Sequence, residues 1–418
     1  MSEALDAVVV GGGAVGVCTA LELARRGASV TLLERGASVA WGCSAGNAGL
    51  ICPSHSEPLN TPAALRAGLS FLTKPDSPLY LRPRRQLLPW IARYLAACTP
   101  ARSRAAARVI RELSERSLVL HEELATAGLE TTFERRGLLN VFSTEAGFAA
   151  GRKEAAEQPA ASPQVLDREG LRELVPAVGG DPVGAVYYPE EAHCDPLRFV
   201  QAVAGAAAEA GVRLRTGVEV LALRRRNGRI ESVQTTAGEL TAGTVVLAAG
   251  AWTPVLTRPL GIYLPVEGGK GYHVDFERGP ADPSLPVAFA ESWVVATPMG
   301  GRIRLAGTLE LAGLDERVSP LRVDAIVRAG RRGLPGLEGR SPIEVWRGLR
   351  PCTPDGLPAI GRQDGLDNLV LATGHAMMGL TLAPITGRLV AELVGGEEPS
   401  YDLAPVRPGR FQPLLGRD

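Results

Sequence analysis

The sequence predicts an α/β protein in which one discontinuous domain, built on a parallel sheet, carries an inserted α+β domain with a mixed sheet. Three observations predict this arrangement. A strand, a glycine turn, a helix and a second strand open the chain; similar strand and helix patterns return near its middle and its end; and different material separates them. The chain has 418 residues, a length that suits two or three domains.

The opening unit is defined by hydrophobic patterning. Ala7–Val10 is an apolar run typical of a strand buried on both faces, and Ser29–Leu33 is a second such strand. Between them Val15–Arg26 has a helical pattern that ends at Gly27. The turn before the helix reads Gly11-Gly12-Gly13-Ala14-Val15-Gly16, a complete G-x-G-x-x-G. These elements form the start of a Rossmann-like domain.

Each glycine of the turn has a physical role. Gly11 permits the tight turn, Gly13 lets backbone N–H groups approach a pyrophosphate, and Gly16 lets the helix pack on the strand. Glu34 closes the second strand about 20 residues further on, where a carboxylate accepts hydrogen bonds from ribose hydroxyls and repels a 2′-phosphate. The unit predicts an adenine dinucleotide. By itself it does not separate FAD from NAD, and a purely structural turn is the alternative.

The middle of the chain alternates between helical and β patterns. Thr61–Gly128 is mostly helical around a Pro-rich stretch, Lys74–Pro83, and Phe133–Phe142 reads as a strand. Arg168–Leu174 reads as a short helix and Gly184–Tyr188 as a strand. We expect this region to belong to the inserted domain.

The rest of the chain returns to dinucleotide-type elements. Asp195 as N-cap and Pro196 at the first helical position start a helix that runs to Ala210. Short strands follow at Val212–Arg215, Val218–Leu223, Ile230–Thr235 and Thr244–Ala248, then a β-rich stretch at Leu264–Thr308 and strand–loop–helix material at Val345–Val394. We therefore expect the nucleotide-binding domain at 1–75, 190–258 and 341–418, and the substrate domain at 76–189 and 259–340.

Two later segments suit a cofactor. Thr244–Gly250 is an apolar strand that runs into small residues, which let a ligand come close. Asn368–Leu389 is a strand, a glycine-flanked loop and a helix, which Thr381 can cap and in whose first turn Pro384 is tolerated. A helix N-terminus there would stabilise negative charge on a reduced cofactor ring. An ordinary connection between a strand and a helix is the alternative.

Several motifs together resemble a known family. They are the glycine turn, Ser44–Gly49, AAGAW at Ala248–Trp252, WRGLRP with TPDG at Trp346–Gly356, and Thr373-Gly374-His375. In this order they resemble the D-amino-acid oxidase-type FAD-dependent oxidoreductases over nearly the whole chain. Within that family the chain looks most like the D-amino-acid dehydrogenases and their D-hydroxyproline dehydrogenase relatives.

The resemblance implies FAD, held without a covalent bond because Cys352 is offset from the linking position of sarcosine oxidases. It places the segment after the second strand beside the isoalloxazine ring. The expected cofactor-binding residues are Gly11, Gly13, Ala14, Val15, Gly16, Glu34, Arg35, Ser44, Asn47, Ala48, Gly49, Leu50, Val220, Ala249, Gly250, Gly374, His375, Gly379, Leu380 and Thr381.

The resemblance also implies substrate contacts. Arg350 stands where related enzymes bind a substrate carboxylate, and a guanidinium can hold it bidentately. A second arginine that some relatives carry is replaced here by Ala376–Met378. Tyr272 and His273 are adjacent on a strand, so only one should face the substrate, and we expect Tyr272. Three further histidines are candidates for a place near the flavin. His375 in the flavin loop is the best of them, His55 is weaker, and His121, on an apparent surface helix, is the weakest.

The predicted function is oxidation of a D-amino acid or cyclic imino acid (D-proline or D-hydroxyproline type) to the imine, by hydride transfer to flavin N5. Electrons then pass to a quinone or dye-like acceptor. No obligatory general base is named, because the cofactor carries the chemistry. Two alternatives stay open: a glycine- or sarcosine-type oxidase that uses O2, and a flavin-binding subunit of a larger electron-transfer complex.

Composition limits other partners and the compartment. Lys+Arg and Asp+Glu balance at 45 each, which argues against nucleic acid, and six scattered cysteines give no metal framework. No signal peptide or transmembrane run is apparent, so we expect a cytoplasmic protein. The apolar pattern at 87–98, near Arg82, Arg84, Arg85 and Arg93, leaves open a peripheral contact with the inner membrane face, although a core-facing helix is favoured. The oligomeric state is not predicted.

Overall fold

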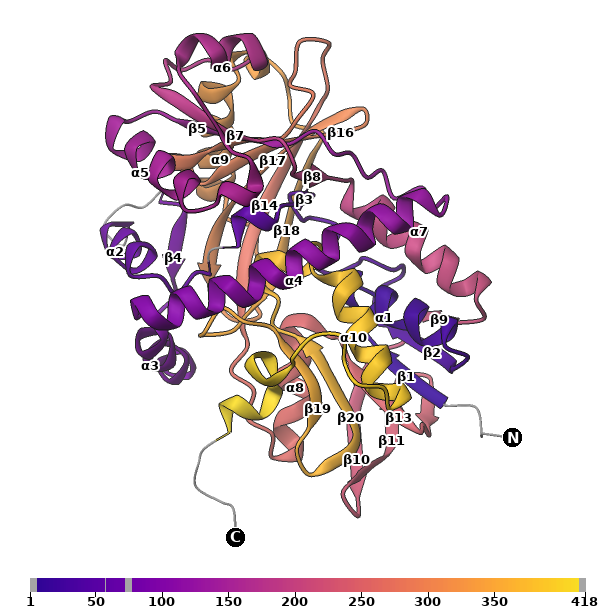
Figure 1. The fold of residues 1–418 in the computed structure, drawn as a ribbon. Helices are drawn as coiled ribbons and strands as arrows, with labels where there is room; N and C mark the ends of the chain where they lie inside the picture. Colours follow the sequence, from indigo (N-terminus) through magenta and orange to yellow (C-terminus); the bar gives the residue numbers. More distant parts are fainter. Residues whose placement is uncertain (1–5, 57, 72–76, 413–418) are drawn as a thin grey trace.

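The computed structural model describes residues 6–56, 58–71 and 77–412. Two large sheets dominate the molecule (Figure 1), and a long helix, α4 (Pro100–Thr126), crosses in front of the boundary between them. The smaller of these two sheets contains the predicted nucleotide-binding strands, and the larger one contains the strands of the inserted domain. The predicted α/β class with an inserted mixed sheet is confirmed.

The six-stranded sheet has the order β19-β20-β13-β1-β2-β9, and its pairs are parallel except for the edge pair β19–β20. Its inner strands are buried along nearly their whole length, which explains their continuous apolar runs. The strands are β1 (Asp6–Val10), β2 (Ser29–Glu34), β9 (Arg213–Thr216), β13 (Thr244–Leu247), β19 (Ala359–Gln363) and β20 (Leu366–Thr373).

A small antiparallel sheet adjoins these strands. It consists of β10 (Val220–Arg226), β11 (Arg229–Thr235) and β12 (Gly238–Leu240). Asn227 and Gly228 both have positive φ at the first turn, as an Asn-Gly hairpin turn requires. The sequence predicted β10 and β11 but not the short β12.

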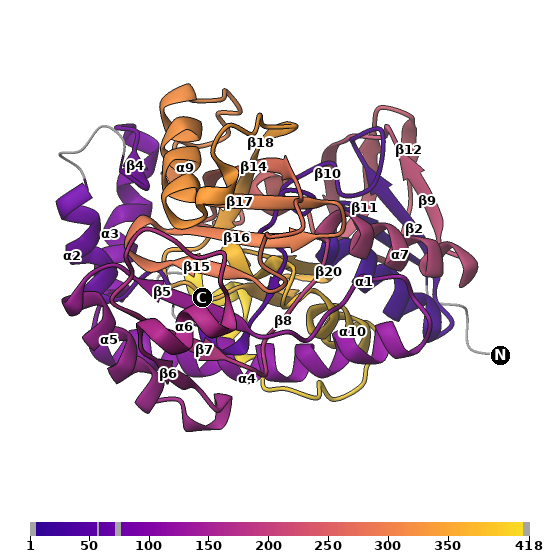
Figure 2. The ribbon, with the colours of Figure 1, turned by 90° about the horizontal axis from the view of Figure 1, so that it is seen from above.

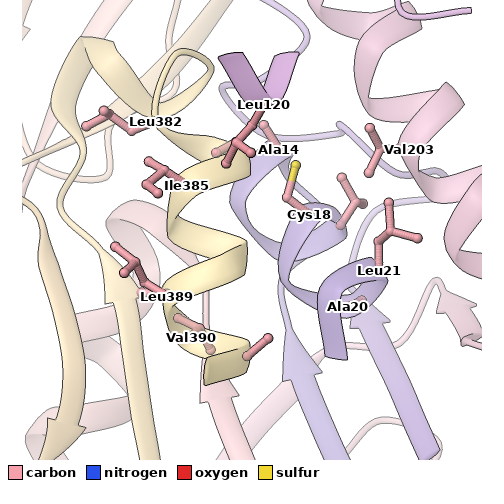
Figure 3. Close-up of a cluster of buried hydrophobic side chains, with 14 of the residues drawn as sticks. Ala14, Cys18, Ala20, Leu21, Leu120, Val203, Leu382, Ile385, Leu389 and Val390 are labelled. Carbon is pink, nitrogen blue, oxygen red and sulfur yellow. The ribbon is translucent and has the colours of Figure 1, made fainter. Parts of the chain in front are cut away.

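Helices cover the six-stranded sheet. Figure 3 shows α1 (Ala14–Arg25) between α10 (Ala383–Gly395) and α7 (Pro196–Glu209), with Leu120 of α4 above it. Gly387 of α10 makes this approach close, since a Cβ there would lie 2.7 Å from the backbone of Cys18 on α1. The cluster joins segments from the start, middle and end of the chain into one core.

The second large sheet has the order β18-β14-β17-β16-β15-β5-β7-β6, with β4 paired to β17. Figure 2 shows α9 (Pro320–Gly333) packed beside β14 and β17, where Ile326 joins the core of this sheet. The strands are β4 (Leu79–Leu81), β5 (Leu138–Phe142), β6 (Gln164–Leu166), β7 (Gly184–Tyr188), β14 (Glu267–Glu277), β15 (Val287–Phe289), β16 (Val294–Met299), β17 (Arg302–Leu311) and β18 (Glu344–Cys352).

The remaining elements are short. The helices are α2 (Pro62–Phe71), α3 (Leu88–Ala97), α5 (Glu145–Ala156), α6 (Arg168–Leu174) and α8 (Thr253–Thr257), and a separate strand pair is formed by β3 (Leu50–Ile51) and β8 (Ala192–His193). Asp195 caps α7 as predicted, because its Oδ1 accepts hydrogen bonds from the N–H groups of Leu197 and Arg198.

Three sequence expectations about these elements need correction. Strand β18 pairs with β14 in the larger sheet, although 341–418 was assigned to the nucleotide-binding domain. Helix α4 lies within 76–189 yet packs on α10. The strand expected at Phe133–Phe142 begins only at Leu138. For β18 and α4, packing against a distant element decided the outcome, and local patterning does not report that packing.

Helix α3 has one buried face. Trp90 and Ala97 are buried and Tyr94 donates a hydrogen bond to the Leu59 carbonyl, while Leu88 and Leu95 are 62% and 50% exposed. The favoured prediction of a core-facing helix therefore holds for the face with Trp90 and Ala97, while the face with Leu88 and Leu95 is exposed. No helix in the described residues has the length and apolar character needed to span a bilayer.

Candidate active site

A cavity of about 690 Å³ lies between the two large sheets. One end is lined by residues at the carboxyl ends of β1, β2 and β13, which is where parallel α/β sheets bind their ligands. The other end is lined by residues of β14, β17 and β18 from the larger sheet. The cavity thus brings the predicted nucleotide site and the predicted substrate domain together.

The glycine turn lies where the sequence predicts. Gly11 has φ +113°, and a Cβ there would lie 2.4 Å from the Ala248 carbonyl oxygen, so only glycine fits. Gly13, Ala14 and Val15 line the cavity at the start of α1. Gly16 does not line it; a Cβ on Gly16 would lie 1.8 Å from the Gly11 carbonyl oxygen, so its role is the close packing of helix on strand.

Glu34 has a fixed carboxylate at the same end. Its two oxygens accept hydrogen bonds from the N–H groups of Gly12 and Gly36, each at 2.7 Å. These charge-assisted bonds hold the carboxylate at the cavity wall, where it can still accept from hydroxyl groups. Arg35 also lines the cavity and stacks on Trp252, with its guanidinium carbon 3.8 Å from the ring centre.

The segment that follows β2 runs along the cavity. Ser44, Asn47, Ala48 and Leu50 line it, and the Ser44 hydroxyl accepts a hydrogen bond from the Ala14 N–H at 3.0 Å. Gly49 is not in the wall; a Cβ there would lie 2.3 Å from the Cys194 carbonyl oxygen. The Asn47 amide donates to the Met377 carbonyl at 3.2 Å, which ties this segment to the loop before α10.

That loop contributes His375, Gly379, Leu380 and Thr381 to the wall, whereas Gly374 lies behind it. The expectation that Thr381 caps α10 is wrong, because the helix starts at Ala383 and the Thr381 hydroxyl donates to the Leu50 carbonyl. This bond instead joins the loop to β3.

Two histidines near this loop are buried. Burial lowers the pKa of His375 to about 3, so its ring is neutral at pH 7, with Nε2 3.0 Å from the Thr386 hydroxyl. His121, expected on a surface helix, is buried instead, and its Nε2 lies 3.2 Å from the carbonyl oxygens of Leu380 and Thr381. His121 therefore supports the cavity loop from outside the cavity.

Arg350 lines the cavity from β18, on the side of the larger sheet. Its Nη1 donates to the Thr308 carbonyl at 2.8 Å, and its guanidinium covers Gly271, where a Cβ would lie 2.0 Å from Nη1. Among the described residues, no aspartate or glutamate forms an ion pair with Arg350. Burial lowers the pKa of Arg350 from its usual value, opposed in part by the Cys352 and Cys43 thiols. A cation in this situation is costly unless an anion joins it.

Thr308 is unusual in its own backbone. It is β-branched and has φ +67°, a conformation that such residues rarely adopt. This turn of the chain directs the Thr308 carbonyl toward Arg350 at the cavity wall. Strain of this kind persists where the surrounding structure fixes it, and here it holds the guanidinium in place.

Tyr272 does not face the cavity, contrary to expectation. Its hydroxyl donates to Glu310 Oε1 at 3.0 Å, in a buried network with Lys270 on the opposite side of β14 from Gly271. Side chains alternate along a strand, so Gly271 facing the cavity forces Tyr272 away from it. His273 shares the cavity side but does not reach the cavity; its ring stacks on Trp346 at 5.2 Å.

A family model described as FAD dependent oxidoreductase matches residues 6–393. The chain belongs to this family of FAD-dependent oxidoreductases. It is 33% identical to the D-amino acid dehydrogenase of Paramagnetospirillum magneticum over 98% of this chain and 100% of that protein. It is 36% identical to the D-amino acid dehydrogenase of Methylobacterium nodulans over 94% and 96% of the two chains.

Solved structures agree with this assignment. The oxidoreductase is similar to glycine oxidase from Geobacillus kaustophilus with a TM-score of 0.79 and 27% identity, over 98% of this chain and 99% of that one. It shares its fold with L-proline dehydrogenase from P. horikoshii, with a TM-score of 0.75 and 23% identity over 98% of both chains. The resemblance inferred from the motifs is confirmed.

The cavity of this oxidoreductase fits FAD. The start of α1 provides backbone N–H groups that have no partner within the helix, which suits a pyrophosphate. Val220, Ala249 and Gly250 line the cavity with Glu34, as expected for the nucleotide end. Cys352, which was considered as a covalent link, is buried and outside the cavity wall.

Several wall residues of the enzyme were not expected from the sequence. Trp346 lines the cavity, and two glycines make room for it, since a Cβ on Gly46 or Gly348 would lie 1.9 Å from its ring. The two glycines are the sequence feature from which a large neighbouring side chain could have been predicted. Cys43 and Leu309 also line the cavity, and nothing in the local pattern marked them.

Proposed function

We propose that this enzyme oxidises the α-carbon–nitrogen bond of a D-amino acid or a cyclic imino acid of the D-proline or D-hydroxyproline type, giving the imine. The observation that carries the proposal is Arg350, a partly buried guanidinium without a carboxylate partner among the described residues, on the side of the cavity formed by the larger sheet. A substrate carboxylate would satisfy it through two parallel hydrogen bonds. The D configuration is supported by relatives named D-amino acid dehydrogenase.

The residues around Arg350 would orient the substrate. The Thr308 carbonyl holds one side of the guanidinium, and the absence of a side chain at Gly271 leaves it room. Leu309 and Val295 line the adjoining wall and would exclude water. FAD, when bound, supplies the hydride acceptor, so the protein's part is to hold the substrate at the correct place and angle.

Two histidines of the cavity wall bear on how the substrate is held. Burial lowers the pKa of His375 to about 3 and that of His55 to about 4, so both rings are neutral at pH 7. Neutral rings neither compete with Arg350 for the carboxylate nor repel the amine. We therefore assign the positive charge that binds the substrate carboxylate to Arg350.

The proposal also names the acceptor to which the reduced enzyme passes its electrons. We propose a quinone or a dye-like acceptor, in keeping with the dehydrogenase names of the curated relatives. A quinone would require contact with a membrane, and exposed Leu88 and Leu95 beside Arg85 are the surface to test with vesicles. An oxidase that uses O2 is the second candidate, favoured by the similarity to glycine oxidase.

Anaerobic reduction of the bound flavin tests the substrate class. Purified enzyme should lose its yellow colour with one or more D-amino acids, D-proline or D-hydroxyproline, and the L-isomers, glycine and sarcosine serve as comparisons. No bleaching with any of these compounds would refute the proposal. Reoxidation by a quinone analogue faster than by O2 would favour a dehydrogenase, and rapid peroxide formation would favour the oxidase. Turnover by the isolated chain would exclude an obligatory larger complex.

A further inference from the structure

Three consecutive carbonyl oxygens in the cavity segment are held by side chains of the larger sheet. Arg304 on β17 donates from Nη1 to the Ala45 carbonyl at 2.7 Å and to the Asn47 carbonyl at 3.0 Å. His273 Nδ1 lies 3.3 Å from the Gly46 carbonyl between them. Burial lowers the pKa of His273 to about 3, so the ring is neutral and must carry its proton on Nδ1 to make this bond.

Holding these carbonyls fixes the opposite edge of the segment. In a trans peptide the C=O and N–H groups point in opposite directions, and the described chain contains no cis peptide. The N–H groups of Gly46 and Ala48 therefore turn away from Arg304, and both residues line the cavity. Within the part of the chain that the structure describes, neither N–H donates to a protein acceptor, whereas the intervening Asn47 N–H donates to Ser44 at 3.1 Å.

Arg304 is itself held rigidly. Asp275 faces it across the β14–β17 pair and accepts from Nε at 2.9 Å and Nη2 at 3.0 Å, a bidentate fork. Asp275 is fully buried and Arg304 is 2% exposed. Arg302 lies 2.9 Å from the same carboxylate and donates to Asp195, the N-cap of α7, at 2.7 Å. The guanidinium therefore has almost no freedom to leave the carbonyls.

The same residues do not make a cation site. His273, Asp275 and Glu344 approach one another closely enough to share a metal ion. Both oxygens of Asp275, however, are already paired with the guanidinium groups of Arg302 and Arg304. A cation would have to displace two fixed positive charges, so we interpret Asp275 as the partner of Arg302 and Arg304 and not as a metal ligand.

We propose that Arg304 is a positioning residue for the flavin. By holding the carbonyls of residues 45–47 on the side of the larger sheet, it leaves the N–H groups of Gly46 and Ala48 free to donate to acceptor atoms of the cofactor ring. Such donors bind more strongly as negative charge develops on the ring during reduction. Arg304 thus raises both FAD affinity and the tendency of the bound FAD to accept electrons. This role is independent of which substrate is oxidised.

The test compares Arg304→Met with Arg302→Met, a matched control that lies on the same strand and contacts the same carboxylate but no carbonyl of the segment. Arg304→Met should raise the dissociation constant of FAD roughly tenfold or more, as expected for loss of charge-assisted bonds. It should also shift the flavin absorption spectrum and move its midpoint potential to more negative values. Arg302→Met should leave all three close to the wild type, and Arg304→Lys should be intermediate.

A second variant guards against loss of folding. Arg304→Met leaves a buried carboxylate with one partner fewer, whereas Arg304→Met with Asp275→Asn removes both charges and nearly preserves volume. The double variant should fold and show the same loss of FAD affinity and potential. Wild-type FAD affinity, spectrum and potential in the folded double variant would overturn the proposal. Equal losses in Arg302→Met and Arg304→Met would do so as well, because they would indicate a general structural effect.

Discussion

Replacing Arg350 by methionine removes the guanidinium but keeps an unbranched, shorter apolar side chain. In the structure this group donates to the Thr308 carbonyl and lines the cavity, and it has no carboxylate partner among the described residues. Loss of one member of a buried charge pair costs about 2–5 kcal/mol. At about 3 kcal/mol, kcat/KM for an amino acid substrate should fall roughly 100-fold.

The same change should not destabilise the free enzyme. Burial already lowers the pKa of Arg350, so the folded state carries an uncompensated charge that methionine would remove. We therefore expect an unchanged or raised Tm together with the large loss of substrate affinity. Arg350→Lys should recover only part of the activity, because an ammonium group cannot form the bidentate pair.

Stopped-flow measurement of anaerobic flavin reduction separates binding from chemistry. The apparent substrate Kd should rise strongly in Arg350→Met, with FAD retained at wild-type affinity. Arg347→Met is the matched control, since Arg347 lies on the same strand but donates to the Glu316 carbonyl at 2.6 Å and does not line the cavity. If Arg350→Met kept kcat/KM within about threefold of the wild type, well under the change expected for a lost charge pair, Arg350 would not be the carboxylate anchor.

Two further predictions follow from the site, and a third concerns Glu191, a buried carboxyl group that does not line the cavity. Gly271→Ala should raise KM with FAD affinity unchanged, because the new Cβ would lie 2.0 Å from Nη1 of Arg350 and push it aside; unaltered KM would contradict this geometry. Glu34→Gln should weaken FAD binding roughly 10-fold or more, because only one end of an amide can accept a hydrogen bond, whereas both carboxylate oxygens accept from the N–H groups of Gly12 and Gly36. Flavin fluorescence on release measures the binding, and wild-type FAD affinity in this variant would argue against the role of Glu34. Burial raises the pKa of Glu191 to about 7, so the folded state holds its proton more tightly than the unfolded state and stability falls as pH rises from about 4.5 to 7. Glu191→Gln should therefore raise the free energy of unfolding at pH 8 by up to ~3 kcal/mol, measured as a higher Tm, with little effect at pH 4.5. An increase in Tm of the same size at both pH values would be the contrary result.

The nucleotide end of the site could be predicted because its requirements are local. Gly11, Gly13 and Gly16 are needed within one turn, and Glu34 ends the next strand of the same unit, so spacing along the chain fixes their places in space. The motif around Arg350 likewise placed a cation in the cavity wall. The domain boundaries, by contrast, remain predictions apart from the placement of β18 and α4.

The sequence by itself determined the position of the glycine turn, because that depends on residues a few positions apart. It also indicated the family and the cofactor, through the order of five short motifs along nearly the whole chain. Tertiary structure alone decided that Tyr272 faces away from the cavity and that His121 lies under the cavity loop. It alone joined Arg304 to Ala45, which are 259 positions apart. Which side of a strand faces a cavity, and which distant segment lies against it, depends on sheet register and packing. Those are properties of the assembled molecule that no local pattern in the chain encodes.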